Sequence, residues 1–251
     1  SVYLIWERGS YYLQFHNLDT SEALVPAKLS NVRPSLMWQD DDTLLMLLDN
    51  YVYSLTIGSP EARLLLSTAS LSDGKLTSIH ELRRSLAARQ LLHRLPDDPD
   101  HVLVAGMNGR FISSVYRLDT LTGDLEMVAD GDGVKATGWH VDANGNPAIA
   151  FRRKDDEIRF FIPSGKKGKY VSHDKTHKKG AVKLDFDGAS YMQRRVAIIG
   201  IGNGPRQVYL ASRLDSDRFR VVEYDALAGE VKQVIFEDPD YDVYTPGLGA
   251  G

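Results

Sequence analysis

A hairpin-like unit recurs along this chain of 251 residues and constrains the fold more than any other feature. The unit has the form of an apolar strand, an Asp, a turn rich in Thr or Ala that contains Gly, and a second strand. Residues 115–128 and 221–234 align without a gap, and looser copies occupy residues 12–25, 52–66 and 158–171. Asp readily begins a tight turn and Gly accepts the positive φ that such a turn needs. Each copy therefore predicts an antiparallel hairpin.

A second repeated unit precedes most copies of the first. It consists of a strand, an acidic or Asn-Gly turn, and a strongly apolar strand. Two hairpins in succession make a four-stranded antiparallel module. Four such modules fit the chain, and a partial module precedes them. The four modules are Ser35–Ser67, Arg89–Ala129, Ala136–Ser172 and Arg195–Glu237, and the partial module is Val2–Leu29.

Tandem modules of about 40 to 50 residues are typical of β-propeller blades. A sandwich or a barrel is the alternative, but neither requires its hairpins to repeat in register. We therefore predict an all-β protein of the β-propeller type, with about five blades or forming part of a propeller of about seven or eight. Several apolar runs alternate as half-buried strands do, for example Val102–Ala105.

The domain organisation predicted from this pattern is simple. Residues 1–243 form the propeller domain, and residues 244–251, rich in Gly and Pro, form a tail or linker. We expect the chain to be a fragment of a larger protein. The one candidate helix is Ser78–Ala88, where Ser78 and Glu81 have the spacing of a capping box and three apolar residues share one face. It would be a short insertion between strands.

Composition excludes several classes of function. The net charge of −4 argues against sequence-independent binding of nucleic acid, which needs a strongly basic surface. No apolar run approaches the roughly 18 residues of a membrane span. The chain has no cysteine, which rules out disulfides, thiolate metal sites and a cysteine nucleophile. We expect a soluble protein, cytoplasmic or periplasmic, with no membrane and no nucleic-acid partner.

Three segments invite a functional interpretation and have a simpler structural one. Residues 166–179 contain six lysines, which suit an anion-binding patch or a solvated loop, and we favour the loop. His173 and His177 have a spacing that holds a metal ion on a helix, but the Lys and Gly around them disfavour a helix. Residues 200–204 are rich in Gly but open no helix, so we interpret them as a hairpin turn instead of a phosphate loop.

Acidic and aromatic residues also have structural interpretations. The run Asp40–Asp42 and the pair Asp130 and Asp132 suggest calcium ligands, but they lie where turns are needed. Trp38 and Trp139 occupy equivalent positions in two modules, which favours packing between blades over stacking on a ligand. We accordingly assign no catalytic, cofactor-binding or metal-binding residue, and we predict no cofactor.

Four segments resemble the N-terminal propeller of the prolyl oligopeptidase family of serine peptidases, in its dipeptidyl-aminopeptidase and acylaminoacyl-peptidase-like branch. They are residues 95–104, 115–123, 138–145 and 234–243. The resemblance covers most of residues 30–243. It implies that an α/β-hydrolase domain of the same parent chain is the partner of this propeller. It also implies that the propeller limits access to that domain to short peptides.

The resemblance carries over no catalytic residue. The hydrolase nucleophile lies on a Gly-x-Ser-x-Gly turn, and the nearest approaches, at residues 58–59 and 188–190, lack that pattern. We therefore expect this chain alone to be inactive toward peptides and toward fluorophosphonates. A stand-alone propeller that binds a protein partner remains the alternative. A propeller glycosidase is a third, and it would need paired carboxylates in a central channel.

Overall fold

The computed structural model describes most of the chain. The described residues are 2–16, 20, 27–29, 31–57, 62–66, 87–107, 111–154, 157–164, 169–172, 196–213 and 216–243. Their regular structure is almost entirely antiparallel β-sheet, with one short 3-10 helix, η2 (Asp132–Val134). No helix in these ranges is long and apolar enough to cross a membrane.

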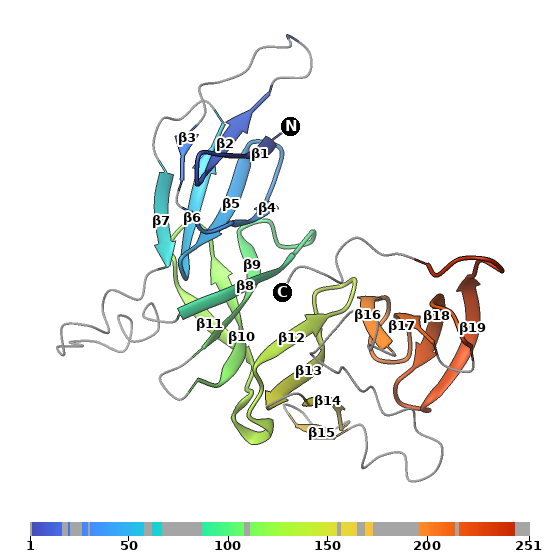
Figure 1. Cartoon of the computed structure of the whole chain (residues 1–251). Helices are drawn as coiled ribbons and strands as arrows, with labels where there is room; N and C mark the ends of the chain where they lie inside the picture. The colour runs from blue at the N-terminus through green and yellow to red at the C-terminus, as the bar shows by residue number, and fades with distance from the viewer. Residues whose placement is uncertain are drawn as a thin grey trace. The chain divides into compact units, whose positions relative to one another are not determined.

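Four sheets have four strands each, and the strands lie side by side in chain order (Figure 1). These sheets confirm the four predicted modules and the partial one before them. The complete sheets consist of β4 (Ser35–Trp38), β5 (Thr43–Leu48), β6 (Tyr51–Thr56) and β7 (Ala62–Leu66); β8 (Ala87–Arg94), β9 (His101–Met107), β10 (Ser113–Asp119) and β11 (Leu125–Ala129); β12 (Gly138–Val141), β13 (Pro147–Lys154), β14 (Glu157–Pro163) and β15 (Tyr170–Ser172); and β16 (Val196–Ile201), β17 (Val208–Ser212), β18 (Arg220–Asp225) and β19 (Glu230–Phe236). A three-stranded sheet consists of β1 (Val2–Glu7), β2 (Ser10–Phe15) and β3 (Ala27–Lys28).

The chain forms two compact units. One comprises residues 1–102 and 118–125, and the other comprises residues 103–117 and 126–251. The division passes through the sheet β8–β11. In the first unit β4 and β5 contact β8, and in the second unit β12 contacts β16. Within each unit, the first strands of two consecutive sheets are therefore in contact.

Turn chemistry explains where the hairpins form. The carboxylate Oδ1 of Asp119 accepts the backbone N–H groups of Leu121 and Thr122, at 2.7 and 2.8 Å, and Gly123 follows with φ of 78°. In the last sheet Asp225 and Gly229, with φ of 75°, repeat this arrangement. The Asp-to-Gly pattern of the sequence is thus a side-chain-capped turn in both of its clearest copies.

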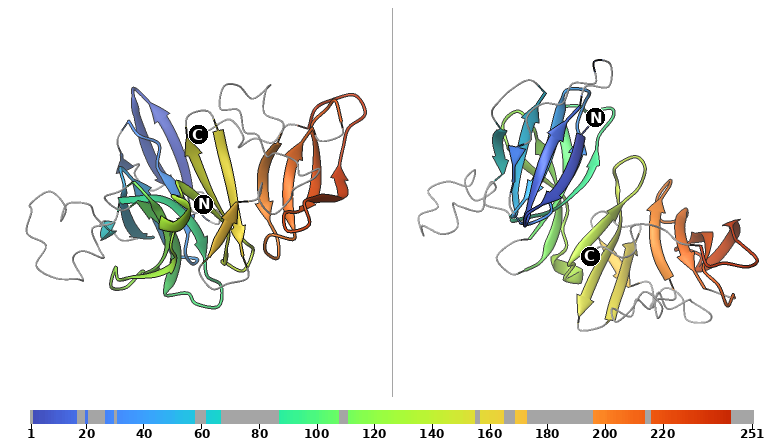
Figure 2. Two further views of the ribbon diagram at one scale, coloured as in Figure 1. Left: turned by 90° about the horizontal axis from the view of Figure 1, so that it is seen from below. Right: turned by 45° about the horizontal axis from the view of Figure 1, so that its top comes forward.

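The core of the second unit lies between two of its sheets. Ile149, Phe160 and Ile162 of β13 and β14 pack against Val208, Leu210, Val222 and Tyr224 of β17 and β18. Figure 2 shows the two sheets, in yellow and in orange to red, as neighbours along the chain. On the other face of β12, the buried Trp139 donates its indole N–H to the carbonyl of Ser113 at 3.0 Å. The sheet β12–β15 therefore packs on both faces.

Two sequence-based expectations need correction. The runs in β5 and β9 are not half-buried: Leu44 to Leu47 and Val102 to Ala105 are buried on both faces. Central strands between packed layers lose the alternation that a single packed face produces. The candidate helix Ser78–Ala88 is also wrong at its end, because Ala87 and Ala88 begin strand β8. The rest of that segment, and the tail 244–251, lie outside the described residues.

Candidate functional site

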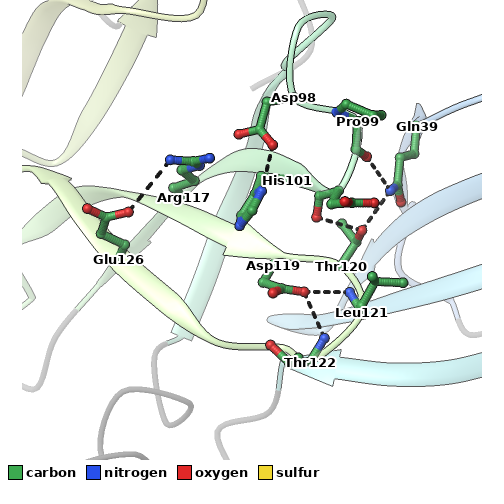
Figure 3. A network of polar contacts seen from close by, with 11 residues as sticks. Gln39, Asp98, Pro99, His101, Arg117, Asp119, Thr120, Leu121, Thr122 and Glu126 are labelled. Atoms are coloured by element: carbon green, nitrogen blue, oxygen red, sulfur yellow. Dashed lines mark hydrogen bonds and ion pairs between the residues drawn. The ribbon is translucent and has the colours of Figure 1, made fainter.

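Polar residues gather where the β8–β9 and β10–β11 turns lie together, and they hold these turns to the preceding sheet. Gln39, which follows β4, donates from Nε2 to the carbonyl of Pro99 at 2.8 Å and to the hydroxyl of Thr120 at 2.6 Å (Figure 3). The Thr120 hydroxyl and backbone N–H both donate to the carbonyl of Asp100. Gln39 thereby ties two turns of one sheet to a turn of another.

An arginine completes this arrangement from the same sheet. Arg63 of β7 donates from Nη1 to the carbonyl of Leu121 at 2.9 Å and from Nη2 to the carbonyl of Thr120. These bonds satisfy carbonyl groups of the β10–β11 turn with a charged donor, which strengthens them. Gln39, Arg63, Pro99, Asp100, Thr120 and Leu121 are called the turn cluster below.

Asp119 and His101 are the titratable groups beside the turn cluster. The backbone N–H of Thr122 is the main cause that holds the pKa of Asp119 below its usual range, and His101 contributes a smaller favourable charge. The His101 Nδ1 lies 2.8 Å from the Asp98 Oδ1, and both side chains are about three-quarters buried (Figure 3). Asp98 therefore fixes the orientation of the imidazole.

An oriented Asp–His pair is part of many hydrolase sites, where the imidazole takes a proton from a hydroxyl. Thr120 is the hydroxyl of the turn cluster, and it donates to the carbonyl of Asp100. Its proton is thus directed at the backbone. His101 and Asp98 are three residues apart, and the backbone N–H of His101 also donates to the backbone carbonyl of Asp98 at 3.1 Å. The contacts between His101 and Asp98 therefore stabilise the β8–β9 turn.

The second unit uses the same turn positions in the same way. Asp225 Oδ2 lies 3.1 Å from Arg206 Nη1, and the N–H of Ala226 donates to the carbonyl of Pro205 at 2.8 Å. The N–H of Ala143 donates to the carbonyl of Gly202 at 2.9 Å, which joins the β12–β13 turn to the β16–β17 turn. Polar groups at these turns therefore form hydrogen bonds and ion pairs that connect one turn to another.

The structure shows what most of the residues singled out in the sequence do. Asp40 Oδ1 accepts the N–H groups of Asp42 and Thr43, and Asp130 Oδ1 accepts that of Asp132 at 2.9 Å, so both act in turns as interpreted. In residues 200–204, the Gly202 N–H donates to the Gln207 carbonyl across a hairpin turn. His173, His177 and most of 166–179 lie outside the described residues. Across the described ranges, His, Asp and Glu form no group of three suited to a metal ion.

The two tryptophans, for which the sequence favoured packing between blades, both contact other aromatic rings. Trp139 is fully buried, and its ring meets the edge of Tyr170 at 5.1 Å. Trp38 is half-buried, with its ring 6.5 Å from that of Phe15 in β2. Trp38 therefore packs against the preceding sheet, whereas the ring of Trp139 contacts its own sheet and reaches the preceding one through its hydrogen bond to Ser113.

Two features of the second unit, a buried histidine and a surface hollow, were not predicted from the sequence. Burial lowers the pKa of His140 to about 4, and its ring lies 5.5 Å from that of Phe151. A surface hollow of about 490 Å³ is lined by Asp130, Gly133, Val134, Ser164, Lys169, Tyr170 and Val171. Burial raises the pKa of Tyr170 to about 12, and its hydroxyl donates to the carbonyl of Pro147. Asp130 and Lys169 are far apart in the sequence, so only the fold brings them to one hollow.

Comparisons with known proteins identify the fold of the chain but no family. No protein-family model and no curated protein matches the chain. A TolB-type protein of Agrobacterium tumefaciens is similar in structure, with 13% identity, a TM-score of 0.50, and 90% of this chain and 70% of that chain covered. TolB of Acinetobacter baumannii matches with 15% identity, a TM-score of 0.48, and 93% and 51% covered. Oligopeptidase B of Leishmania major matches with 13% identity, a TM-score of 0.41, and 92% and 31% covered.

The fold class is therefore established. The chain is all-β, with four-stranded antiparallel sheets repeated like propeller blades, and it shares this fold with propeller proteins of known structure.

Proposed function

We propose that this chain is the non-catalytic propeller of a serine peptidase of the prolyl-oligopeptidase type. Its partner is an α/β-hydrolase domain of the same parent chain, and its role is to admit short peptides to that domain while excluding folded proteins. The proposal is supported by where the four family-like segments lie. Three of them, residues 95–104, 115–123 and 138–145, each contain a blade strand and the turn that follows or precedes it.

The fourth segment supports the same function. Residues 234–243 contain the end of β19 and a polar stretch that returns to the sheet. Asp242 accepts the N–H of Phe219 at 2.7 Å and pairs with Arg213 at 2.5 Å, and the Arg213 guanidinium lies over the Phe219 ring. The backbone donor of Phe219 is the main cause that lowers the pKa of Asp242. The polar stretch after β19 is thus anchored to its own sheet, which gives the fourth family-like segment a defined place on a blade.

A rigid scaffold is what a size filter requires, and the turn cluster supplies rigidity. Gln39 and Arg63 hold the turns of the next sheet by four hydrogen bonds to backbone or hydroxyl oxygens. Each such bond adds stability only while the two sheets keep their spacing, so the sheets resist separation. In this proposal the propeller contributes access control, and the chemistry belongs entirely to the hydrolase domain.

The test compares residues 1–251 with the full-length natural polypeptide that contains them. We expect a fluorophosphonate probe to label one serine of the full-length protein, outside residues 1–251, and to leave the isolated chain unlabelled. Peptide mapping by mass spectrometry locates the label. The full-length protein should also hydrolyse aminoacyl or acylaminoacyl chromogenic peptides, and replacement of the labelled serine by Ala should abolish both reactions.

Two results would overturn the proposed function. One is specific labelling of a serine within residues 1–251. The other is a correctly folded full-length protein that is neither labelled nor active on the peptides, which would favour a stand-alone binding propeller.

A further inference from the structure

The three-stranded sheet differs from the others at its first strand. Among the described residues, β1 lies at one edge of this sheet and pairs only with β2. Its residues are exposed compared with those of other blades: Tyr3 is 50%, Ile5 38% and Trp6 55% exposed. In β5, by contrast, Leu44 to Leu47 are buried. The described part of the chain therefore leaves large apolar side chains of β1 exposed beside its unpaired edge.

Turn geometry identifies β1 as the counterpart of the second strand of a blade. Arg8 and Gly9 form a two-residue turn with φ of 49° and 77°, and Asp49 and Asn50 form the same turn between β5 and β6 with φ of 51° and 69°. Two consecutive positive φ values mark a type I′ hairpin. Both hairpins also join strands of six residues in full register. The position of β1 thus matches that of β5.

First and second strands are connected differently. In the four complete sheets this connection is longer than two residues, and it comprises residues 39–42, 95–100, 142–146 and 202–207. The hairpin of β1 and β2 therefore cannot be a first-to-second connection of the kind seen in this chain. Within the described residues, the sheet β1–β3 therefore has the counterparts of the second, third and fourth strands of a blade, and no counterpart of the first strand pairs with β1.

Alternate residues of β1 direct their backbone hydrogen-bonding groups away from β2. In a two-residue hairpin, the residues beside the turn exchange hydrogen bonds and the pattern alternates along the strand. The register places Glu7 opposite Ser10, so Tyr3, Ile5 and Glu7 direct their N–H and C=O groups to β2. Those of Leu4 and Trp6 point to the free edge. Such an edge is a template for pairing with an extended segment.

We propose that β1 binds a further antiparallel strand along this edge, and that the strand is a segment of the parent polypeptide upstream of Val2. In every complete sheet, the first strand comes immediately before the second in chain order. The first strands of the complete sheets vary in length and polarity, from four residues in Ser35–Trp38 and Gly138–Val141 to eight in Ala87–Arg94, which contains two arginines, and a turn containing Asp or Gly follows each of them.

Amide hydrogen exchange, read by NMR or by mass spectrometry with residue resolution, tests the proposal. We expect the amides of Leu4 and Trp6 to exchange on the order of 100-fold more slowly in the full-length natural polypeptide than in residues 1–251. The amide of Ile5 pairs with β2, so it serves as an internal control that is protected in both proteins. Equal rates at Leu4 and Trp6 in the two proteins would refute the proposal.

A deletion identifies where the strand comes from. Removing only the residues upstream of Ser1 from the full-length polypeptide should restore fast exchange at Leu4 and Trp6. Protection that survives this deletion would mean that the strand comes from elsewhere, which would overturn the proposed source.

A pair of substitutions tests the backbone contact. Leu4→Pro removes the outward N–H while leaving the β1–β2 bonds, since proline is tolerated on an edge strand. Leu4→Val keeps that N–H and is the matched control. In residues 1–251 the two variants should melt at similar temperatures. In the full-length protein, only Leu4→Pro should lose the protection at Trp6, and protection retained in that variant would count against strand addition.

Discussion

Gly123 has both a positive φ and a close contact with another strand, whereas Gly9 has a positive φ alone. The φ of Gly123 is 78°, and a Cβ added to it would lie 2.5 Å from the backbone carbonyl oxygen of Leu65 in β7. Gly9 has nearly the same φ, 77°, but nothing lies within 4 Å of its added Cβ. Both glycines belong to the first compact unit. Their replacement by alanine therefore compares backbone strain alone with strain plus a steric clash.

The expected magnitudes differ enough to measure. A left-handed alanine costs about 1–2 kcal/mol, which both variants share. Forcing an atom into a packed contact adds about 1–3 kcal/mol. We expect Gly9→Ala to lower the free energy of unfolding by about 1–2 kcal/mol and Gly123→Ala to lower it by about 2–5 kcal/mol.

Urea unfolding followed by tryptophan fluorescence measures both values, and unchanged m-values show that the transitions are comparable. Because the contact to Leu65 joins two sheets, Gly123→Ala should also weaken the hold of Arg63 on the turn. Losses that agree within about 0.5 kcal/mol for the two variants would refute the reasoning, because the close approach to Leu65 would then carry no cost.

Three further predictions concern single side chains. Burial depresses the pKa of His140 from 6.5 to about 4, so the unfolded chain binds the proton more tightly and stability should fall as pH drops from about 6.5 through 4. His140→Phe should flatten this dependence, and an NMR titration that gives a pKa near 6.5 would contradict it. Asp119→Ala removes the acceptor of two turn amides and should cost about 1 kcal/mol in urea unfolding, whereas Asp119→Asn, which keeps an oxygen, should cost less; equal losses would count against the capped turn. Trp139→Phe loses the bond to Ser113 and leaves a cavity, so it should cost about 3 kcal/mol, and a neutral result would show that this packing is unimportant.

The turns could be predicted from the sequence because their chemistry is local. Asp119 reaches the amides of Leu121 and Thr122, two and three residues further on, and Gly123 meets the φ requirement itself. The turn cluster had no such signal. Gln39 and Pro99 are 60 residues apart, and Arg63 and Thr120 are 57 apart. Their contacts depend on the spacing of two sheets, which no short segment encodes.

The amino-acid sequence alone determined the modular plan of this protein: which segments become strands, where each sheet turns, and that a Gly-x-Ser-x-Gly nucleophile is missing. Those properties depend on residues close together in the chain. Tertiary structure decided burial, pKa values and strand pairing at the sheet edges, because these properties depend on what each sheet contacts. Packing on both faces buries the middle of β9, and burial lowers the pKa of His140. The strand order leaves one edge of β1 unpaired among the described residues.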